Sequence, residues 1–482
     1  MSLGKVAARG TVVSLGGQWT KFIVQLASIT ILARVLTPTD FGVMAMILAI
    51  VGAATVLGDF GLSLAAIQAK NLTENQRANL FWINSSIGVT LSIVVYLLAD
   101  PIARFYEQPQ LVGVTQALAV IFFMNGVVVQ LRADLTRSMR FGALALCDVL
   151  AQVVALAVSL SLAFSGYGVW ALVAQQICVA GTTLLCSAWF VRWIPGLPRR
   201  NANMRKLLSF GGNTMATQLV NYSSANIDSV LLGRVRGAFE LGIYDRAYQL
   251  FKIPMQQMAA PMTRVALPVL MKLEDAAEYM RYLVKAQKGL SYALLMLFAF
   301  AAGAADPLLR LALGEGWDEA PAIFRILAIG GAFQALAYVY YWIFLSTGRV
   351  DLHFRFSLVG RLIMIGAIAA GVNWGAIGTA IGSSFGFFAL WLIYSAWGVP
   401  RTGVSSLPIM KSSIRPVGLA VGLFSVLLIG DNLLPDGLPA VILLVGLAFL
   451  GCFYVFVVLL LVRGVRADLI ELARVAYRAV GR

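Results

Sequence analysis

The sequence predicts an all-α, polytopic membrane protein of about fourteen transmembrane helices, with two six-helix lobes in a parallel repeat plus two C-terminal helices. Three observations support this fold class. The 482 residues are 60% hydrophobic and only 12% charged, with a mean hydropathy of +0.84, which is too apolar for a soluble domain. Long apolar segments recur along the whole chain. A stretch near the start also repeats about 200 residues later.

Hydropathy places fourteen apolar segments that are long enough to cross a bilayer as helices. The connections between them are alternately rich and poor in Lys and Arg, which predicts that both termini are cytoplasmic. The same pattern explains the net charge of +15: the basic residues face an anionic inner leaflet, and no nucleic-acid partner is expected. The segments are 11–34, 41–66, 78–99, 112–131, 141–164, 168–191, 207–233, 240–263, 286–305, 319–346, 355–372, 375–397, 412–430 and 438–462.

The repeat defines the expected domain organisation. The stretch LARVLTPTDFG (32–42) aligns without a gap with LGRVRGAFELG (232–242). Six spans separate the two copies, so both have the same orientation, which is typical of two lobes related by an axis along the membrane normal. The expected parts are an N-lobe at 1–191 (helices 1–6), a basic interlobe linker at 192–206, a C-lobe at 207–397 (helices 7–12), and helices 13–14 with an amphipathic basic tail at 398–482.

Polar side chains form rows on three of the expected helices. In hydrocarbon, a polar row has to face protein or water, because each unpaired polar group costs several kcal/mol. At about 100° per residue each row occupies one face of its helix, so we expect these helices to line a water-filled cavity between the lobes. The rows are Ser14, Gln18, Lys21, Gln25 and Ser28 on the first helix; Asn213, Thr217, Asn221, Ser224 and Asp228 on the seventh; and Asp245, Gln249, Lys252 and Gln256 on the eighth.

Charged side chains inside the spans are the strongest indication of a binding site. Lys21 lies near the middle of the first span, where an unpaired charge costs at least ~2.5–3.5 kcal/mol. Arg246 and Lys252 lie in the eighth span. These cations either bind an anion in a wet cavity, where partial desolvation strengthens charge–phosphate contacts, or form internal salt bridges with Asp148 or Asp228. The two carboxylates either carry a coupling proton or sodium ion or are permanent counter-ions.

Other local patterns complete the sequence-based picture. Thr37-Pro38-Thr39-Asp40 has the composition of a helix start. Prolines at 254, 261 and 268 predict a bent eighth helix. The segments 272–288 and 466–482 are amphipathic, as expected for helices on the inner membrane surface. The four cysteines lie within apolar spans, which favours core positions over metal ligands. No P-loop or catalytic cluster is found, so we expect neither an enzyme nor a bound cofactor.

Several stretches resemble a known family. They are LARVLTPTDFGVMAM (32–46), RADLTRSMRFGALAL (132–146), GYGVWALVAQQ (166–176), NIDSVLLGRVRGAFELGIYDRAYQL (226–250) and VALPVL (265–270). The chain resembles the polysaccharide transporter family of the multidrug/oligosaccharidyl-lipid/polysaccharide exporter superfamily. Within that family it is most similar to the O-antigen and colanic-acid exporters, which are lipid-linked oligosaccharide flippases of the bacterial inner membrane.

The resemblance implies a substrate, a mechanism and an energy source. The implied substrate is an undecaprenyl-pyrophosphate-linked oligosaccharide, moved to the outer leaflet by alternating access and driven by a proton or sodium gradient. Cationic residues on the first and eighth helices hold the pyrophosphate in this superfamily. We therefore expect the pyrophosphate at Lys21, Lys252 and Arg246, and ion coupling at Asp228 and Asp148. A glycan polymerase is an expected partner. Sugar contacts are expected from amides, which offer a donor and an acceptor each: Gln18, Gln25, Asn221 and Gln249.

Three alternatives remain open at this point. A cation-coupled multidrug exporter of the same fold would need a net acidic cavity, whereas these rows carry at least as many cations as anions. A membrane enzyme of glycan assembly would need a long external loop with arginines or acids. A scaffold without transport activity would not need polar rows that face a cavity.

Overall fold

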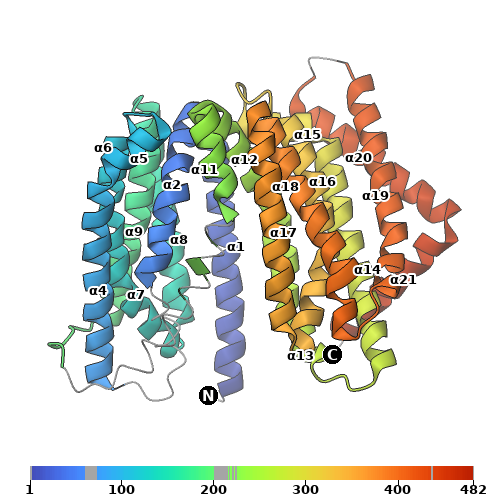
Figure 1. The fold of residues 1–482 in the computed structure, drawn as a ribbon, viewed down its shortest axis with the longest axis horizontal. Coiled ribbons are helices and arrows are strands. Elements are labelled where there is room, and N and C mark those ends of the chain that lie inside the picture. The colour runs from blue at the N-terminus through green and yellow to red at the C-terminus, as the bar shows by residue number, and fades with distance from the viewer. Residues whose placement is uncertain are drawn as a thin grey trace. The chain divides into compact units, whose positions relative to one another are not determined.

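The computed structural model describes residues 3–59, 73–199, 225–435 and 438–480, together with positions 215, 218, 219 and 222. Every regular element in these ranges is a helix, and none is a strand. Ten of the helices are long and apolar enough to cross a membrane. The all-α membrane fold is therefore confirmed (Figure 1). The count of fourteen spans stays a prediction, partly because most of the seventh span lies outside the described residues.

The chain forms two compact units, Met1–Gly242 and Ile243–Arg482. In the first, α8 packs on α9 and on α1, and α4 packs on α7. Glycines allow α4 and α7 to approach closely, since a Cβ on Gly126 would lie 2.6 Å from the Asn84 carbonyl oxygen. The helices of this unit are α1 (Leu3–Val35), α2 (Pro38–Asp59), α4 (Glu74–Leu97), α5 (Ala99–Tyr106), α6 (Leu111–Leu118), α7 (Val120–Arg137), α8 (Phe141–Phe164), α9 (Val169–Val191) and α11 (Ile227–Arg236).

The start of α2 has the capping arrangement that its sequence predicts. The Thr37 backbone N–H donates to the Asp40 carboxylate at 3.0 Å, and the Asp40 N–H donates to the Thr37 hydroxyl at 3.3 Å. Two of the otherwise unpaired polar groups at the helix N-terminus are thereby satisfied. Pro38 takes the first helical position, where its missing N–H costs nothing.

The two copies of the sequence repeat touch each other reciprocally. A Cβ on Gly42 would lie 1.7 Å from the carbonyl oxygen of Ala238, and a Cβ on Gly242 would lie 1.8 Å from that of Pro38. Both pairs of positions are related by the 200-residue offset of the repeat. A contact in which each copy uses the same positions is what a two-fold relation produces. Only glycine allows the backbones of α2 and α12 (Ala238–Pro254) to approach this closely.

In the second unit, α17 packs closely on α18, and α14 on α19. The predicted bend of the eighth span is found as a break in the α-helix. A π-helical segment, η1 (Met255–Ala259), separates α12 from α13 (Ala260–Leu270), directly after Pro254. The other helices are α14 (Ala276–Gly303), α15 (Ala305–Leu313), α16 (Ala320–Ser346), α17 (Val350–Gly371), α18 (Gly375–Ile393), α19 (Leu407–Leu433), α20 (Ala440–Leu461) and α21 (Arg463–Val480), with the short segments η2 (Val372–Trp374), η3 (Tyr394–Gly398) and η4 (Pro400–Thr402).

Two segments of this unit were expected to be amphipathic surface helices. The segment 272–288 is not a separate surface helix, because residues 276–303 form the single helix α14. Its charged first turns are stable as a continuation of the apolar span that follows. The amphipathic tail does form a helix, α21, and its side chains Val465, Leu469 and Leu472 pack against Tyr292 of α14 and Leu419 of α19.

The predicted linker begins as a segment bound to α4. The Asn79 amide accepts from the Arg199 N–H at 2.8 Å and donates to the Arg199 carbonyl at 2.6 Å. The Trp82 indole N–H donates to the Gly196 carbonyl at 2.8 Å. Residues 192–199 therefore belong to the first unit, and residues 200–206 lie outside the described ranges. Along the chain, the first compact unit ends at Gly242, and the lobe boundaries inferred from the repeat stay a prediction.

Candidate functional site

Three predicted site residues lie on α1. Gln18 and Gln25 are exposed, Lys21 is half-buried, and Ser28, the last member of the row, is buried. Ser28 accepts a hydrogen bond of 2.6 Å from the Gln175 side chain of α9. The C-terminal end of the row is therefore fixed within the first unit. Lys21 makes no hydrogen bond or ion pair with any residue that the structure describes. Its ammonium group is therefore available to an anion.

Lys21 lies close to the contact between α1 and α8. A Cβ on Gly17 would lie 2.5 Å from the Ala145 side chain, so the two helices touch there. Lys21 follows Gly17 by four residues, and Asp148 follows Ala145 by three. Each is thus on the contact face of its helix, about one turn from the point of contact. The first unit places a cation and a carboxylate from the predicted site in one neighbourhood.

Asp148 is not the partner of Lys21 but of an arginine that sequence reasoning missed. The Arg132 guanidinium donates to both carboxylate oxygens of Asp148, at 2.8 Å and 3.4 Å. The two side chains are 32% and 29% exposed, so the pair is partly desolvated. The hydropathy window ended the fourth span at residue 131 because Arg132 lowers its score, whereas α7 continues to Arg137. No local pattern predicts this pair, because Arg132 and Asp148 lie on different helices, α7 and α8.

Asp228 lies in the first turn of α11 and is 4% exposed. Its carboxylate accepts from the Ser229 N–H at 2.9 Å, and α11 packs on α2 and α5. Asn221, the amide predicted two turns earlier on the same helical face, lies outside the described residues.

Asp245 and Gln249 of the predicted row on α12 form a polar network with Arg246. The Asp245 carboxylate receives the Arg246 guanidinium at 2.6 Å and the Gln249 amide N–H at 3.0 Å. All three side chains are half-buried. Because the Asp245 carboxylate already neutralises Arg246, the guanidinium attracts a further anion less strongly. Arg246 is therefore better suited to orienting this network than to neutralising a phosphate by itself.

Lys252 has an aromatic neighbour. Its ammonium nitrogen lies 4.1 Å from the centroid of the Tyr248 ring, within the range of a cation–π contact. Tyr248 stacks on Tyr244 with centroids 5.5 Å apart and also contacts Phe251. This contact positions the Lys252 ammonium group against the face of Tyr248. Lys252 lies two residues before Pro254, immediately ahead of the π-helical segment.

The structure thus describes the predicted site as two groups. Gln18, Lys21, Gln25, Asp148 and Asp228 belong to the first unit, and Arg246, Gln249 and Lys252 to the second. Within the described ranges, no three His, Cys, Asp or Glu side chains are placed to bind a metal ion. The groups offer cations, amides and aromatic faces, which is chemistry for recognising an anionic, hydroxyl-rich ligand.

Comparison with known sequences identifies relatives over most of the chain. Lipopolysaccharide biosynthesis protein WzxC of Escherichia coli (strain K12) is 27% identical, over 88% of this chain and 84% of its own. Teichuronic acid biosynthesis protein TuaB of Bacillus subtilis (strain 168) is 29% identical, over 75% and 77%. Succinoglycan biosynthesis transport protein ExoT of Rhizobium meliloti (strain 1021) is 23% identical, over 94% and 92%.

Solved structures share the fold. The lipid II flippase MurJ in an inward closed conformation aligns with a TM-score of 0.72 at 13% identity, covering 93% of this chain and 99% of MurJ. An inward-facing multidrug resistance MATE family transporter aligns with a TM-score of 0.62 at 16% identity, covering 83% and 99%. The family described as polysaccharide biosynthesis protein matches residues 31–322, which is more than half of the chain. The resemblance noted in the sequence is thus confirmed at the level of the family, and this chain belongs to that polysaccharide biosynthesis family.

Proposed function

We propose that this protein is an alternating-access flippase. It moves an undecaprenyl-pyrophosphate-linked oligosaccharide from the inner to the outer leaflet of the bacterial inner membrane, for export of an O-antigen-type or other exopolysaccharide. Family membership supports the pathway, and the fold shared with a lipid II flippase supports the type of transport. Both termini are cytoplasmic in this proposal, as the distribution of Lys and Arg predicts.

The observation that carries the proposal is that Lys21 is half-buried and has no ion pair within the described residues. A lysine in the middle of a transmembrane helix is costly unless it is paired or hydrated. Binding of an anionic substrate would explain why a lysine occupies this position. We assign the substrate's pyrophosphate to Lys21 and Lys252, with Arg246 assisting through Asp245. Gln18, Gln25, Asn221 and Gln249 are the proposed sugar contacts.

The remaining parts of the proposal concern energy and partners. A proton or sodium gradient drives the cycle, with Asp228 and Asp148 as the coupling carboxylates. Carboxylates that are at least partly desolvated suit this role, because their protonation depends on nearby cations. Asp148 already has Arg132 beside it, so protonation of Asp148 would release the arginine. A glycan polymerase that receives the flipped substrate is the proposed partner.

Polymer export in cells that depend on this gene tests the pyrophosphate assignment. Lys21→Ala and Lys252→Ala are each expected to abolish export, because each removes a charge-assisted contact worth about 1.5–3 kcal/mol. Lys21→Arg keeps the charge and is expected to retain part of the activity. Lys272→Ala, which removes an exposed lysine, serves as the matched control. Normal export in both alanine variants at normal membrane levels would refute the assignment.

The second candidate is a cation-coupled multidrug exporter. The MATE-like fold and the buried Asp228 favour it, since a buried carboxylate suits a cationic drug. The pair of cations Lys21 and Arg132 around the single carboxylate Asp148 argues against it. A drug-resistance assay separates the two functions: the flippase proposal predicts unchanged drug susceptibility when the gene is deleted.

A further inference from the structure

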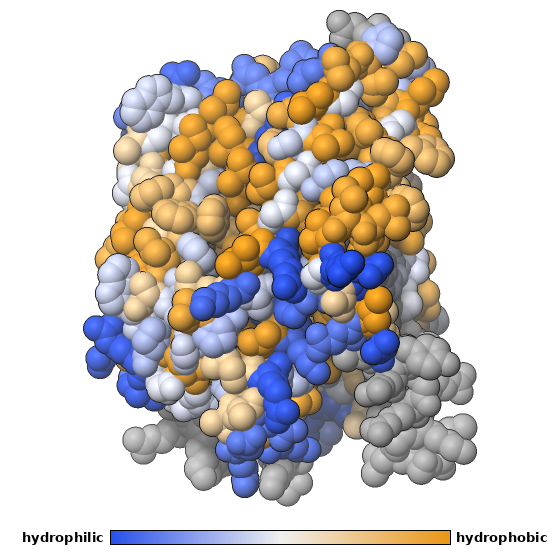
Figure 2. Space-filling model, turned by 90° about the vertical axis from the view of Figure 1, so that its right-hand side faces the viewer, coloured by the Kyte–Doolittle hydropathy of each residue, from blue (hydrophilic) through white to orange (hydrophobic). Residues whose placement is uncertain are grey.

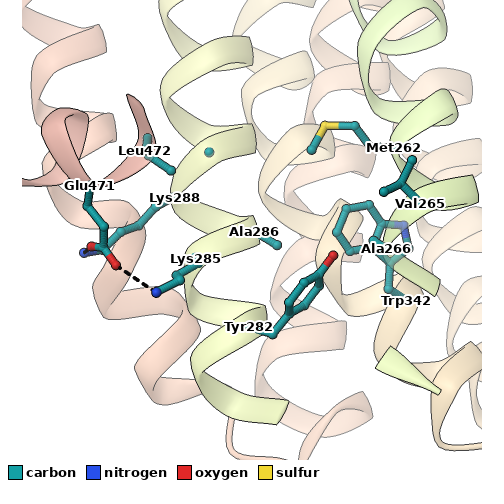
Figure 3. Close-up of a pocket in the computed structure, with 11 residues that line it drawn as sticks. Met262, Val265, Ala266, Tyr282, Lys285, Ala286, Lys288, Trp342, Glu471 and Leu472 are labelled. Carbon is teal, nitrogen blue, oxygen red and sulfur yellow. Dashed lines mark ion pairs between the residues drawn. The ribbon is translucent and has the colours of Figure 1, made fainter. Parts of the chain in front are cut away.

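The second unit contains an apolar pocket that the proposed transport site does not use. Its volume is about 360 Å³, and α13, α14, α16 and α21 form its walls. Met262, Val265 and Ala266 come from α13, Trp342 from α16, and Leu472 from α21 (Figure 3). Lys285 and Lys288 of α14 lie along one edge. The pocket therefore combines an apolar interior with a cationic rim.

A hydrogen bond fixes one wall of the pocket. The Trp342 indole N–H donates to the Thr263 hydroxyl at 2.8 Å, which fixes the ring. The Tyr282 hydroxyl points into the pocket (Figure 3), and it makes no hydrogen bond to any residue that the structure describes. An apolar cavity with one polar group fits a hydrocarbon chain and a polar linkage better than it fits ordered water, which needs two to four polar partners.

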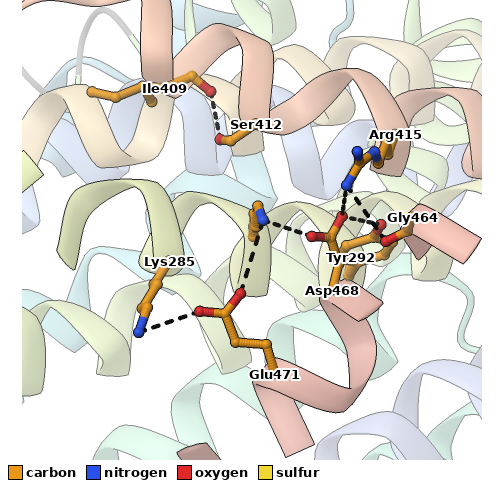
Figure 4. Close-up of polar contacts among 9 residues, drawn as sticks. Lys285, Tyr292, Ile409, Ser412, Arg415, Gly464, Asp468 and Glu471 are labelled. Carbon is orange, nitrogen blue, oxygen red and sulfur yellow. Dashed lines mark hydrogen bonds and ion pairs between the residues drawn. The ribbon is translucent and has the colours of Figure 1, made fainter. Parts of the chain in front are cut away.

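The two lysines at the rim differ in how firmly they are paired. Lys288 donates to Asp468 at 2.6 Å, and the Asp468 side chain is only 5% exposed. Arg415 and Tyr292 also donate to Asp468, so this contact anchors α21 (Figure 4). Lys285 contacts Glu471 at 3.2 Å, but the two side chains are 52% and 42% exposed. An exposed pair contributes only about 0–1 kcal/mol, so another anion can replace Glu471 on Lys285.

The length of α14 places this rim near the membrane surface. Its 28 residues extend roughly 42 Å, about 12 Å more than the hydrocarbon core of a bilayer. The segment before α14 is one of the basic connections predicted to be cytoplasmic, so the excess is at the cytoplasmic end. Lys285 is the tenth residue of the helix and therefore lies at headgroup depth. On this side of the unit, hydrophilic side chains lie below a broad hydrophobic area (Figure 2).

We propose that this pocket binds an anionic phospholipid of the inner leaflet. One acyl chain fills the apolar pocket, the phosphate replaces Glu471 on Lys285, and the Tyr282 hydroxyl donates to the phosphate or to an ester carbonyl. Charge complementarity selects an anionic headgroup over a zwitterionic one. The exposed arginines of α21, Arg463, Arg466 and Arg474, keep that helix at the anionic surface. The bound lipid contacts α13, which follows the break after Lys252.

Native mass spectrometry of the full chain, purified in detergent and delipidated, tests this site with phosphatidylglycerol and phosphatidylcholine as probes. Phosphatidylglycerol is expected to bind more tightly. Lys285→Gln is expected to weaken its binding roughly fivefold, which corresponds to about 1 kcal/mol for one lysine near an anionic lipid. Glu471→Gln is expected to strengthen binding, because it removes the competing carboxylate. Ala286→Phe, which fills the pocket, is expected to abolish binding at this site.

Lys272→Gln is the matched control, since it removes an exposed lysine outside the pocket and is expected to leave binding unchanged. If Ala286→Phe does not fold, the opposite effects of Lys285→Gln and Glu471→Gln still decide the question. Equal binding of the two lipids would overturn the proposal. So would equal effects of Lys285→Gln and Lys272→Gln, or displacement of phosphatidylglycerol by inorganic phosphate alone. Failure here leaves the flippase proposal untouched, because no residue assigned to the oligosaccharide lines this pocket.

Discussion

Asp148, which was predicted to carry a coupling ion, forms an ion pair with Arg132. Because the pair is only partly exposed, removing one partner leaves a poorly solvated charge behind. Asp148→Asn is therefore expected to destabilise the protein by about 1 kcal/mol, and Arg132→Gln in the same chain is expected to restore stability. Thermal unfolding of the purified wild type, Asp148→Asn and the double variant measures this. A double variant that is no more stable than Asp148→Asn would mean that the pair does not act as a unit.

Polymer export by the same double variant separates the two roles of Asp148. If Asp148 carries the coupling ion, as proposed, the restored protein stays inactive, because no titratable group remains at that position. Restored export would show instead that Asp148 is only the counter-ion of Arg132. Sequence reasoning found Asp148 and Lys21 because charges stand out in apolar spans. It missed Arg132 because a residue at the end of a hydropathy window resembles an ordinary cytoplasmic arginine.

Asp468 makes the docking of α21 dependent on pH. Burial opposes ionisation of this carboxyl, but the hydrogen bonds and charges of Lys288 and Arg415 outweigh it, so the pKa of Asp468 lies below its ordinary value of 3.8. A lowered folded-state pKa contributes stability that is fully present above the unfolded value and is lost as the pH falls through the folded value. Docking of α21 is therefore expected to be constant at neutral pH and to weaken below about pH 4.

Spin-label distances between α21 and α19 measure this docking as the pH falls. Asp468→Asn is expected to shift the distances already at neutral pH and to remove most of the change that acid produces in the wild type. Distances that are the same in Asp468→Asn and the wild type at neutral pH would contradict the assigned anchor.

At the scale of elements, the contact between α2 and α12 gives a second stability prediction. Gly42→Ala places a Cβ 1.7 Å from the Ala238 carbonyl oxygen, and Gly242→Ala meets Pro38 in the same way. Each substitution forces the two backbones apart and is expected to cost about 1–3 kcal/mol. Gly366→Ala, where no atom lies within 4 Å of the added Cβ, is the control. Thermal unfolding in detergent compares them, and equal melting temperatures for all three would contradict the contact.

The helices themselves could be predicted well, for a simple physical reason. A bilayer leaves backbone polar groups no partner except one another, so a long apolar segment has to be a helix. What hydropathy could not predict is where charged turns continue a span. The first turns of α14 were expected to form a surface helix, yet Ala276–Gly303 is one helix. Gly42 and Gly242 were noticed as identical repeat positions, but their reciprocal contact depends on tertiary packing that no local pattern contains.

For the molecule as a whole, the sequence predicted the family and the fold class, and both are confirmed. The net charge of +15, which alone would suggest nucleic acid, is consistent with an anionic lipid surface in a protein of this fold. The polar rows in the sequence singled out Lys21 on α1 and Lys252 on α12, the two lysines to which the pyrophosphate is assigned. The helix contact of Lys21 beside Asp148 could not be predicted, because it depends on side chains distant in sequence. The contact of Lys252 with Tyr248 is local, four residues apart on α12, but the polar rows considered only hydrophilic side chains.

The most direct test of the central claim is transport itself. The purified protein is reconstituted into liposomes with the undecaprenyl-pyrophosphate-linked oligosaccharides extracted from its own host, and their accessibility to a membrane-impermeant glycosidase is followed under an ion gradient. Wild-type protein is expected to move the lipid-linked oligosaccharide between leaflets, whereas the Lys21→Ala and Lys252→Ala variants leave it in place. Transport that is equally fast in all three proteins, or no faster with the wild type than in protein-free liposomes, would contradict the account.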